Sequence, residues 1–593
     1  MNFQDPGIMK LISSRPNPAG AADSTLLLLV GDAVSTPIEK IIPQDGVSLP
    51  SQRNDLDGFL LKVAHFNDFH GRIAHLLPDG NEPLFSRMAG GLRKMRADCQ
   101  GDENAALIVL SAGDDLVGSL FGELIRTSPK GKRIHPAYRA YSAAGVDISG
   151  VGNHDLDPGM GLFTESTLRD ANFPVLSANL KLCSQTVPAF HPAAILITKG
   201  VRIGIVGLTT PAENRKFNQA EFEIVDPVSV CNNLLPALRP HCDVLIILSH
   251  LGLCLESKGA PVAMAGDMEL AQQLDPDLVD LIVGGHTHDE LNRFGLEPSC
   301  MINQIPIVQA GAFGAMIGEV TLTHHQGRFK VTDAALAETA ALGPDQQFER
   351  QVVQPLVEAL QPLRTRVLGH TTDHQDLTVE AVTSQLADGE SALANLITDA
   401  LVERCLLNGF KVDCAMIDRT CLATGLTPGT LLTFEDWYPL MPYLDNIQVL
   451  TLSGEQFTRL LHDNARRIND CEYPLEERGF AHFSQAVRYT IQSGCVRMAS
   501  RAVEITLAGQ LPAEQPNRAI RIATSSFFRG LCTEWEKSTG FEDLLIHKSA
   551  DLSLEGTRLF VRDEIVQYLV EHGGASRAAG VRRDGRVKVL ESV

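Results

Sequence analysis

Short apolar runs alternate with longer amphipathic segments between about residues 60 and 331. The runs have the length of buried strands, and the segments between them have the spacing of helices. Strands that are separated by helical segments predict an α/β domain in which the strands lie between layers of helices. The predicted strands cover residues 60–66, 105–110, 201–208, 244–248 and 281–283.

The rest of the chain divides into three further parts. A polar segment with helical spacing, residues 345–367, predicts a helical linker. After it, a second α/β region runs from Gly369 to the C-terminus, with helices predicted over 391–407 and 562–572. Residues 1–58 are rich in Pro, Gly, Ser and Ala and show no regular pattern, so they stay unassigned. We therefore expect an N-terminal extension (1–58), a first α/β domain (59–340), a linker (341–368) and a second domain (369–593).

Composition narrows the class of protein. The 593 residues are 44% hydrophobic, which is typical of a folded globular chain. With 51 Lys and Arg against 72 Asp and Glu, the formal charge is −21. That charge disfavours binding to nucleic-acid phosphates or to anionic lipid. No apolar stretch approaches the roughly 20 residues that span a bilayer, so we expect no membrane-spanning segment.

The number and spacing of the cysteines indicate the redox conditions of the cellular compartment in which the protein folds. The twelve cysteines include no CxxC pair, and the chain has no N-x-[ST] glycosylation site. Neither a zinc ribbon nor a dense disulfide framework is indicated. Together these features favour a reducing, cytoplasmic location.

Polar side chains follow four of these runs and also the apolar stretch through Val146 and Val151, at the point where each run ends. Because the carboxyl ends of strands in an α/β sheet lie along one edge, we expect these side chains to meet. The residues are Asp68 and His70, then Asp114, then Asn153, then His250, and finally His286 and His288.

The residue types limit the chemistry. Asp, Asn and His supply oxygen and nitrogen donors without a thiolate, which suits Zn, Mn, Fe or Co. Seven candidates are too many for one tetrahedral ion and fit two ions that share a carboxylate. A pair of ions can bind a phosphate, lower the pKa of a bridging water and stabilise attacking and leaving oxygens. We therefore expect two divalent metal ions and a hydrolase of phosphate esters.

These motifs resemble those of the calcineurin-like metallophosphoesterases, and more narrowly the branch of 5'-nucleotidases, UDP-sugar hydrolases and 2',3'-cyclic-nucleotide phosphodiesterases. Stretches typical of that branch are Gly90-Gly91-Leu92-Arg93, residues 173–179 (FPVLSAN), Gly207-Leu208-Thr209-Thr210-Pro211 and Gln309-Ala310-Gly311. The resemblance implies a four-layer α/β/β/α sandwich, a helical linker and a second α/β domain of the 5'-nucleotidase C-terminal type.

The resemblance also implies roles for single residues. One metal would be held by Asp68, His70 and His288, and the other by Asn153, His250 and His286, with Asp114 bridging them. His154 and Asp157 match the catalytic dyad of the family: His154 would stabilise charge on the phosphoryl oxygens or protonate the leaving group, and Asp157 would orient its ring. The nucleophile would be a metal-bound hydroxide.

The second domain departs from the family pattern where substrate binds. Residues 418–423 (DRTCLA) replace a glycine-rich loop that ends in arginine. Gly389 falls where an arginine is usual, and Ile447 falls at the first of two base-stacking aromatic positions. Phe527 or Phe528 retains the second aromatic, and Arg419 offers replacement charge. We therefore name Phe527 and Arg419 as substrate contacts and expect AMP to be a poor substrate.

Three functions stay open at this point. The first is hydrolysis of nucleotide-like phosphate esters by a 5'-nucleotidase-like enzyme with a divergent substrate pocket. The second is a cyclic-nucleotide phosphodiesterase or nucleotide-sugar pyrophosphatase activity at the same metal site. The third is a noncatalytic, metal-containing binding protein, which the retention of all ligands and the dyad disfavours. The expected partner is a small-molecule phosphate ester, without nucleic acid or membrane, and the oligomeric state is open.

Overall fold

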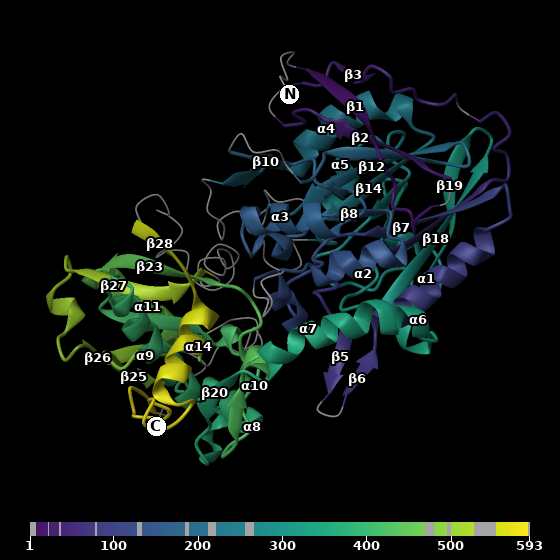
Figure 1. Cartoon of the computed structure of the whole chain (residues 1–593). Coiled ribbons are helices and arrows are strands. Elements are labelled where there is room, and N and C mark those ends of the chain that lie inside the picture. The colour runs from purple at the N-terminus through teal and green to yellow at the C-terminus, as the bar shows by residue number, and fades with distance from the viewer. Residues whose placement is uncertain are drawn as a thin grey trace. The chain divides into compact units, whose positions relative to one another are not determined.

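The computed structural model describes residues 7–21, 23–34, 37–51, 53–77, 80–126, 133–183, 189–211, 221–254, 266–468, 480–494, 500–526 and 553–590. The described residues up to Leu360 form one compact unit, and those from Gln361 onward form a second. Figure 1 shows the elements of both units. We describe each unit by itself.

The first unit contains a six-stranded sheet in which the central strands are parallel. β4, β7, β8 and β9 run in the same direction, and β18 pairs antiparallel with both β4 and β19. The sheet order is β19 (Arg328–Glu338), β18 (Met316–His325), β4 (Leu60–Phe66), β7 (Ala105–Ser111), β8 (Ile148–Gly150) and β9 (Val175–Leu176).

The second sheet of this unit has nine strands. β12, β14, β15 and β17 are parallel. The sheet order is β16 (Met301–Ile302), β17 (Ile305–Val308), β15 (Leu281–Val283), β14 (Val244–His250), β12 (Val201–Thr209), β11 (Ala193–Thr198), β2 (Thr25–Val30), β1 (Ile8–Ser14) and β3 (Lys40–Pro43). Two small ribbons lie outside the sheets: β5 (Ala74–Leu77) with β6 (Gly80–Pro83), and β10 (Leu180–Leu182) with β13 (Phe222–Ile224).

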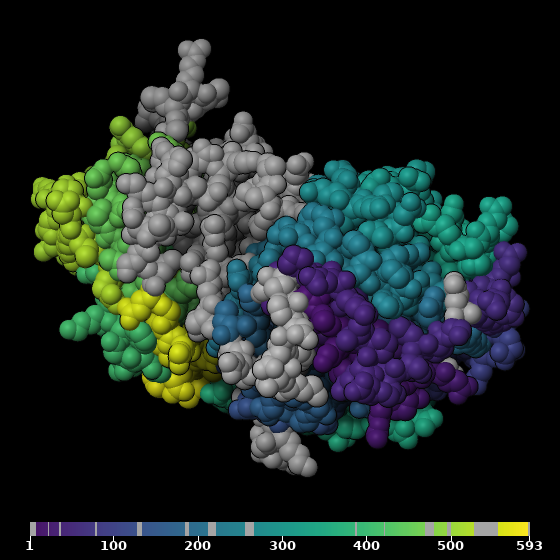
Figure 2. Space-filling view, turned by 90° about the horizontal axis from the view of Figure 1, so that it is seen from above, coloured from purple at the N-terminus to yellow at the C-terminus, as the bar shows by residue number. Residues whose placement is uncertain are grey.

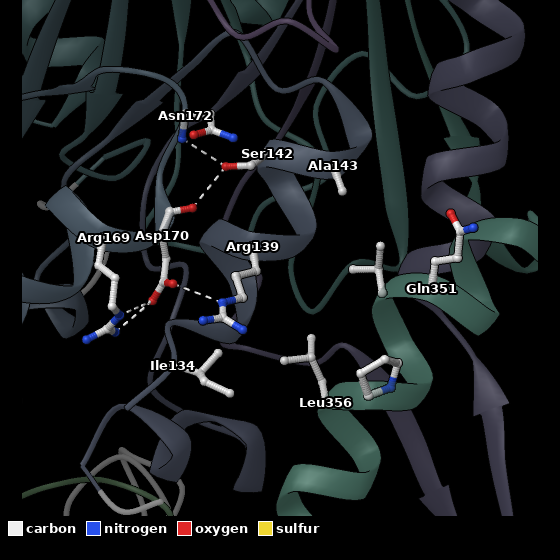
Figure 3. Close-up of a pocket in the computed structure, with 11 residues that line it drawn as sticks. Ile134, Arg139, Ser142, Ala143, Arg169, Asp170, Asn172, Gln351 and Leu356 are labelled. Carbon is white, nitrogen blue, oxygen red and sulfur yellow. Dashed lines mark hydrogen bonds and ion pairs between the residues drawn. The ribbon is translucent and has the colours of Figure 1, made fainter. Parts of the chain in front are cut away.

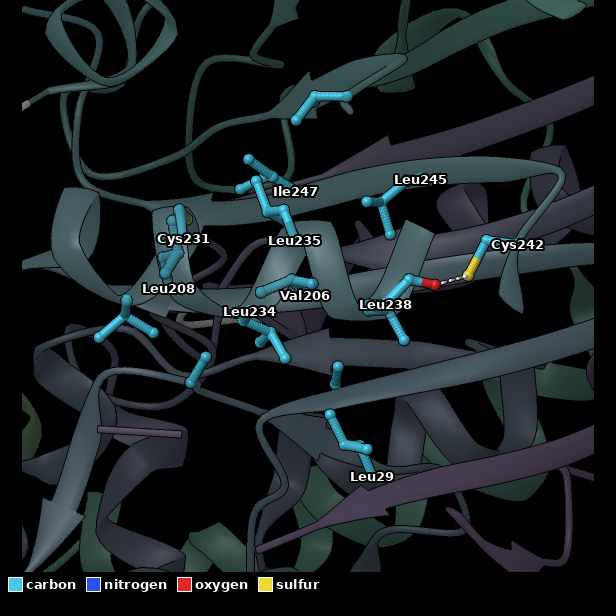
Figure 4. Close-up of a cluster of buried hydrophobic side chains, with 14 of the residues drawn as sticks. Leu29, Val206, Leu208, Cys231, Leu234, Leu235, Leu238, Cys242, Leu245 and Ile247 are labelled. Carbon is cyan, nitrogen blue, oxygen red and sulfur yellow. Dashed lines mark hydrogen bonds between the residues drawn. The ribbon is translucent and has the colours of Figure 1, made fainter. Parts of the chain in front are cut away.

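The two sheets pack face to face, with helices on their outer faces. Val63 and Leu110 of one sheet share a buried cluster with Ile205 and Leu248 of the other. On the outside of the nine-stranded sheet, α4 (Pro227–Leu238) and α5 (Asp267–Gln273) contribute to a second cluster, drawn in Figure 4. On the outside of the six-stranded sheet, the rings of Phe66 and of Tyr141 from α2 (Pro136–Ala144) lie 5.1 Å apart, beside α1 (Phe85–Cys99) and α3 (Met160–Asp170). The predicted α/β/β/α sandwich is confirmed.

Burial on both faces explains why these strands read as continuous apolar runs. All seven residues of β7 and all seven of β14 are buried. A strand covered on both faces loses the alternation of apolar and polar residues that marks a half-exposed strand. The five predicted strands are all present; β7 and β12 extend one residue and β14 extends two residues beyond the predicted ends.

The N-terminal region, which the sequence pattern leaves unassigned, contains strands of its own. β2 pairs antiparallel with β11, β1 pairs with β2, and β3 runs parallel to β1, so these strands extend the nine-stranded sheet. The side chains of Leu27 and Leu29 are buried in the cluster beneath α4. In Figure 2 this purple region lies at the surface beside the teal residues of the same unit. The four consecutive leucines of β2 are a short, doubly buried strand, which composition alone did not reveal.

The expected helical linker is present. It consists of α6 (Gln346–Phe348), a π-helical turn (Glu349–Val353) and α7 (Gln354–Arg364). Asp345 begins it, because its carboxylate accepts hydrogen bonds from the amides of Gln347 and Phe348.

The second unit contains a five-stranded and a three-stranded sheet around one core. Met416, Leu450, Phe457 and Ile522 share its buried cluster. The order of the five-stranded sheet is β24 (Ala481–Phe483), β21 (Cys414–Asp418), β27 (Ala519–Ser525), β23 (Asn446–Ser453) and β28 (Ser553–Phe560). The order of the three-stranded sheet is β26 (Arg501–Leu507), β25 (Val487–Gln492) and β29 (Val587–Leu590). A smaller ribbon pairs β20 (Val367–His370) with β22 (Leu431–Thr433).

The second unit contains both of the helices that the sequence predicts, 391–407 and 562–572. α9 spans Ala392–Leu407, with the Ser391 hydroxyl accepting from the amide of Ala394 at its start. α14 spans Val561–His572. The other helices are α8 (Val379–Ala387), α10 (Phe434–Trp437) and α11 (Gly454–Arg467). No helix in the described parts of the chain is long and apolar enough to cross a membrane.

Candidate metal centre

The predicted ligands come from strand ends of two sheets, rather than from one edge of a single sheet. The loops after β4, β7 and β8 of the six-stranded sheet carry Asp68, His70, Asp114 and Asn153. The end of β14 and the loop after β15 in the nine-stranded sheet carry the three remaining histidines. The site is therefore assembled between the two layers of strands.

The first group consists of Asp68, His70 and His288, whose ligand atoms all lie within 4.8 Å of one another. Asp68 Oδ1 is 3.2 Å from Nε2 of His288. Nε2 of His288 is in turn 3.4 Å from Nε2 of His70. The other ring nitrogen of His70 donates to the carbonyl of Val117 at 2.5 Å, which leaves Nε2 as the coordinating atom.

The second group consists of Asp114, His250 and His286, again within 4.8 Å. Nε2 of His250 is 3.1 Å from Oδ2 of Asp114, and Nδ1 of His250 donates to the carbonyl of Ala112 at 2.7 Å. The predicted fourth member, Asn153, joins this group, because its Oδ1 lies 3.0 Å from Nδ1 of His286.

The two groups adjoin through their carboxylates. Oδ2 of Asp114 is 4.0 Å from Nε2 of His70, which belongs to the first group. Oδ1 of Asp68 is 3.8 Å from Nε2 of His250, which belongs to the second. Asp114 thus lies where a ligand shared between two neighbouring cations would lie.

Five of these residues adopt left-handed backbone conformations, which are uncommon for residues other than glycine. The φ angles are 49° at Asp68, 52° at His70, 55° at Asp114, 79° at His286 and 61° at His288. Such conformations persist only where the surrounding structure imposes them, and they cluster at functional sites. Here the loops brace one another: the His70 amide donates to the Asp114 carbonyl at 2.8 Å.

The loops after β7 and β8 approach each other closely at Gly152, which precedes Asn153, and this explains why the position is a glycine. A Cβ atom at this position would lie 2.1 Å from Oδ1 of Asp114. Only glycine lets the loops after β7 and β8 come this close.

The donor set fits divalent cations. Asp68, Asp114 and His250 are at most 1% exposed. Oδ1 of Asp68 and Nε2 of His250 are buried, and each lies within 3.2 Å of another candidate ligand, His288 and Asp114 respectively. Buried charged groups are costly unless they are paired or bind a metal, so buried ligand atoms that face one another in this way favour cation binding.

The electrostatics of the bare site point the same way. Burial favours the neutral carboxyl of Asp114, but His250 and His154 outweigh burial and hold the pKa of Asp114 well below its usual range. Burial disfavours the charged form of His250, yet Asp114 and Asp68 raise the pKa of this histidine to about 10. The carboxylates thus create a strongly negative potential that attracts positive charge.

The predicted dyad residues are adjacent to the ligand groups. Nδ1 of His154 lies 2.7 Å from Oδ2 of Asp157. The His154 amide donates to Oδ1 of Asp114 at 2.8 Å, and its ring centroid is 5.6 Å from that of His70. The imidazole is therefore oriented by a carboxylate at the border of the metal centre.

Two further residues, Asp155 and Phe313, for which the sequence predicts no role, also shape the site. Asp155 is buried and accepts hydrogen bonds from the amides of Gly152, Asp114 and Asp115, so it joins the loops after β7 and β8. Phe313 packs its ring 5.4 Å from that of His70 and 5.2 Å from that of His288. Asp155 directly follows two predicted site residues, Asn153 and His154, a position that could have identified it, whereas Phe313 had no comparable signal.

The predicted substrate contacts belong to the second unit. Arg419 follows β21 and is 8% exposed. Ile447 is fully buried in β23, where it pairs with Ser525. Phe527 and Phe528 lie outside the described residues. The roles of Arg419 and Phe527 stay predictions.

A separate cavity of about 440 Å³ in the first unit contains none of the predicted site residues. It lies between α2, α3 and the linker, and both Arg139 and Arg169 at its wall donate to the carboxylate of Asp170 (Figure 3). Because those charges already pair, we do not place the reaction there.

Comparison with known proteins identifies relatives along most of the chain. A 5'-nucleotidase of Bos taurus is 24% identical over 492 residues, which cover 76% of this chain and 79% of that protein. A 5'-nucleotidase of Vibrio parahaemolyticus is also 24% identical, over 458 residues, which cover 72% of this chain and 77% of that protein.

Solved structures share the fold. A putative 5'-nucleotidase from Staphylococcus aureus, in complex with alpha-ketoglutarate, matches with a TM-score of 0.69 at 18% identity, over 90% of this chain and all of that one. A 5'-nucleotidase precursor from Thermus thermophilus matches with a TM-score of 0.56 at 20% identity, over the same shares of the two chains.

Family models match both parts of the chain. Residues 61–290 match the calcineurin-like phosphoesterases, and residues 367–530 match the 5'-nucleotidase C-terminal domain. The resemblance inferred from the motifs, the hydrolase class and the two-domain α/β architecture are therefore confirmed. The chain therefore combines a part that matches the calcineurin-like phosphoesterases with a part that matches the 5'-nucleotidase C-terminal domain, and 5'-nucleotidases are similar to it along most of its length.

Proposed function

We propose that this protein hydrolyses phosphate esters at a centre that binds two divalent cations. The observation that carries the proposal is the pair of adjoining ligand groups, each of three or more residues, at strand ends and in the loops that follow them. Asp68, His70 and His288 would hold one cation, and Asn153, His250 and His286 the other. Asp114, whose Oδ2 faces His250 at 3.1 Å and His70 at 4.0 Å, would contact both.

Bound cations of this kind supply Lewis acidity toward a phosphoryl oxygen and make water a better nucleophile near neutral pH. The overall reaction adds water to phosphorus and breaks the bond to the ester oxygen, so the products are an alcohol and a phosphate. The departing oxygen needs a proton or a hydrogen bond as charge builds on it. The protein must therefore place a donor beside the ligand groups.

His154 is suited to that donor role. Asp157 accepts from its Nδ1 at 2.7 Å, which fixes the ring, and we assign the donor role to the other ring nitrogen, Nε2. The carboxylate also stabilises the protonated form of the imidazole. The hydrogen bond from the His154 amide to Asp114 ties this group to the ligands, so its distance from the reacting phosphate is set by the same loop.

Nucleotide-like phosphate esters are the proposed substrate class. The named relatives are 5'-nucleotidases, which supports nucleotides. Three of the usual contact positions of the second unit are changed, however, since Gly389 and Ala423 carry no charge and the side chain of Ile447 is buried. We therefore expect recognition of the leaving group to differ from that of AMP-specific members.

The test combines metal analysis with a substrate panel. Purified protein supplied with Mn²⁺ or Zn²⁺ is assayed against phosphomonoesters, cyclic diesters and nucleotide sugars, and its metal content is measured by mass spectrometry. Two ions per chain together with turnover of a monoester support the proposal. A protein that holds two ions and is inactive on the whole panel would instead be a binding protein.

A further inference from the structure

Gln309 is a fully buried side chain next to the loop that carries two candidate ligands. It follows directly after β17, and the Gly284–Asp289 segment follows the neighbouring strand β15. That segment contains His286 and His288, which belong to different ligand groups. Gln309 itself is in neither group.

The amide of Gln309 binds both ends of this loop. Its Nε2 donates to the carbonyl of Gly285 at 3.0 Å, one residue before His286. Its Oε1 accepts from the backbone amide of Asp289, one residue after His288. These two partners fix the orientation of the side-chain amide, because a carbonyl can only accept and a backbone N–H can only donate.

The loop needs this support because of its backbone conformation. His286 and His288 have φ angles of 79° and 61°. A left-handed residue other than glycine is strained, so two of them within three residues need support from bonds outside the segment. Between them, the Thr287 hydroxyl accepts from the Leu253 amide at 3.0 Å and lies 3.4 Å from Oε1 of Gln309.

We propose that Gln309 is a positioning residue that sets both candidate cation sites at once. It holds the segment from Gly285 to Asp289 so that His286 faces the group of Asp114 and His288 faces the group of Asp68. This role rests on the proposed function, because it assumes that both groups bind cations. It also predicts a coupling that a ligand of one group alone cannot produce: a change at Gln309, which is in neither group, should weaken both sites.

The test compares metal binding in Gln309→Leu and Gln309→Glu with that in wild type. Equilibrium dialysis against graded Mn²⁺, followed by mass spectrometry, gives the affinity of each site. Residues that support metal ligands typically change affinity by about 10–100-fold, and we expect Gln309→Leu to weaken both sites by that factor. Gln309→Glu keeps the acceptor for Asp289 but loses the donor to Gly285, so it should weaken both sites less.

Gln385→Leu is the matched control. Gln385 is also a buried glutamine (5% exposed) that joins two segments, donating to Asp376 and accepting from the Ala392 amide, but it lies in the second unit. We expect this variant to keep both ions at wild-type affinity. His288→Asn should weaken one site only, which provides the pattern of a single lost ligand.

A second readout is the rise in thermal midpoint that Mn²⁺ produces, since a bound ligand stabilises the folded state according to its affinity. This rise should be smaller in both Gln309 variants than in wild type and unchanged in Gln385→Leu. Wild-type affinity at either site in Gln309→Leu would overturn the proposed coupling. Wild-type protein that binds no ions would contradict the proposed function instead.

Discussion

Nδ1 of His154 and Oδ2 of Asp157 lie 2.7 Å apart, within the turn that connects β8 to α3. The same turn carries Asn153, whose Oδ1 is 3.0 Å from Nδ1 of His286 in the other sheet. One short loop thus supplies a candidate metal ligand and an oriented imidazole. This arrangement lets the effect of the imidazole be separated from that of the ligands.

Replacing His154 by Ala should lower turnover of a phosphomonoester by about 10²–10⁴-fold, because general acid catalysis contributes about that factor. Metal content should stay at the wild-type value, since the side chain of His154 is not in either ligand group. The loss should be smaller for a p-nitrophenyl ester, whose leaving group needs little protonation. Steady-state kinetics on both esters, with metal analysis of the same samples, measure these effects.

Asp157→Asn provides the graded control for this dyad. It keeps the size of the side chain but removes the negative charge, so the loss of turnover should be smaller than in His154→Ala. Unchanged turnover in His154→Ala would remove this histidine from the mechanism.

Removal of single ligands should reveal the division into two groups. His288→Asn is expected to leave one ion bound, because the second group keeps all its members. Asp114→Asn is expected to weaken both ions, since its carboxylate lies 3.1 Å from His250 and 4.0 Å from His70. Dialysis followed by mass spectrometry distinguishes the two patterns, and equal effects of both variants would contradict the bridging position of Asp114.

The sequence predicted the parts of this molecule that local patterns determine. Strand β4 begins and ends at the predicted residues, and α9 begins one residue after its predicted start, because the Ser391 cap is a local signal. The candidate ligands were also found, because each follows an apolar run directly.

Features that depend on distant segments could not be predicted. The pairing of β2 with β11 joins residues about 170 positions apart, as in Leu26 with Leu196. Likewise, the left-handed conformation of Asp114 reflects bracing by neighbouring loops, and the support of His286 and His288 by Gln309 requires β15 and β17 to be adjacent. Nothing in the spacing of these residues indicates such contacts.

AMP should be a poor substrate relative to other phosphate esters. Stacking on an aromatic side chain contributes about 1–3 kcal/mol per base, and Ile447 offers neither an aromatic ring nor an exposed surface. Comparison of kcat/KM for AMP and for a simple alkyl phosphate tests this point. A clear preference for AMP would show that other residues bind the base and that our alignment of the second unit is wrong.

The N-terminal strands should be required for the stability of the first unit. Leu29 of β2 is fully buried in the cluster beneath α4. Replacing a buried leucine by alanine removes contacts and leaves a cavity, at a cost of about 2–5 kcal/mol. We therefore expect Leu29→Ala to lower the urea concentration at which the first unit unfolds. Leu168→Ala is the control, because this α3 side chain is 70% exposed and its loss should change stability by less than about 0.5 kcal/mol. Equal stability of the two variants would mean that residues 25–30 contribute little to the core, and the nine-stranded sheet would then have to be stable without its N-terminal edge.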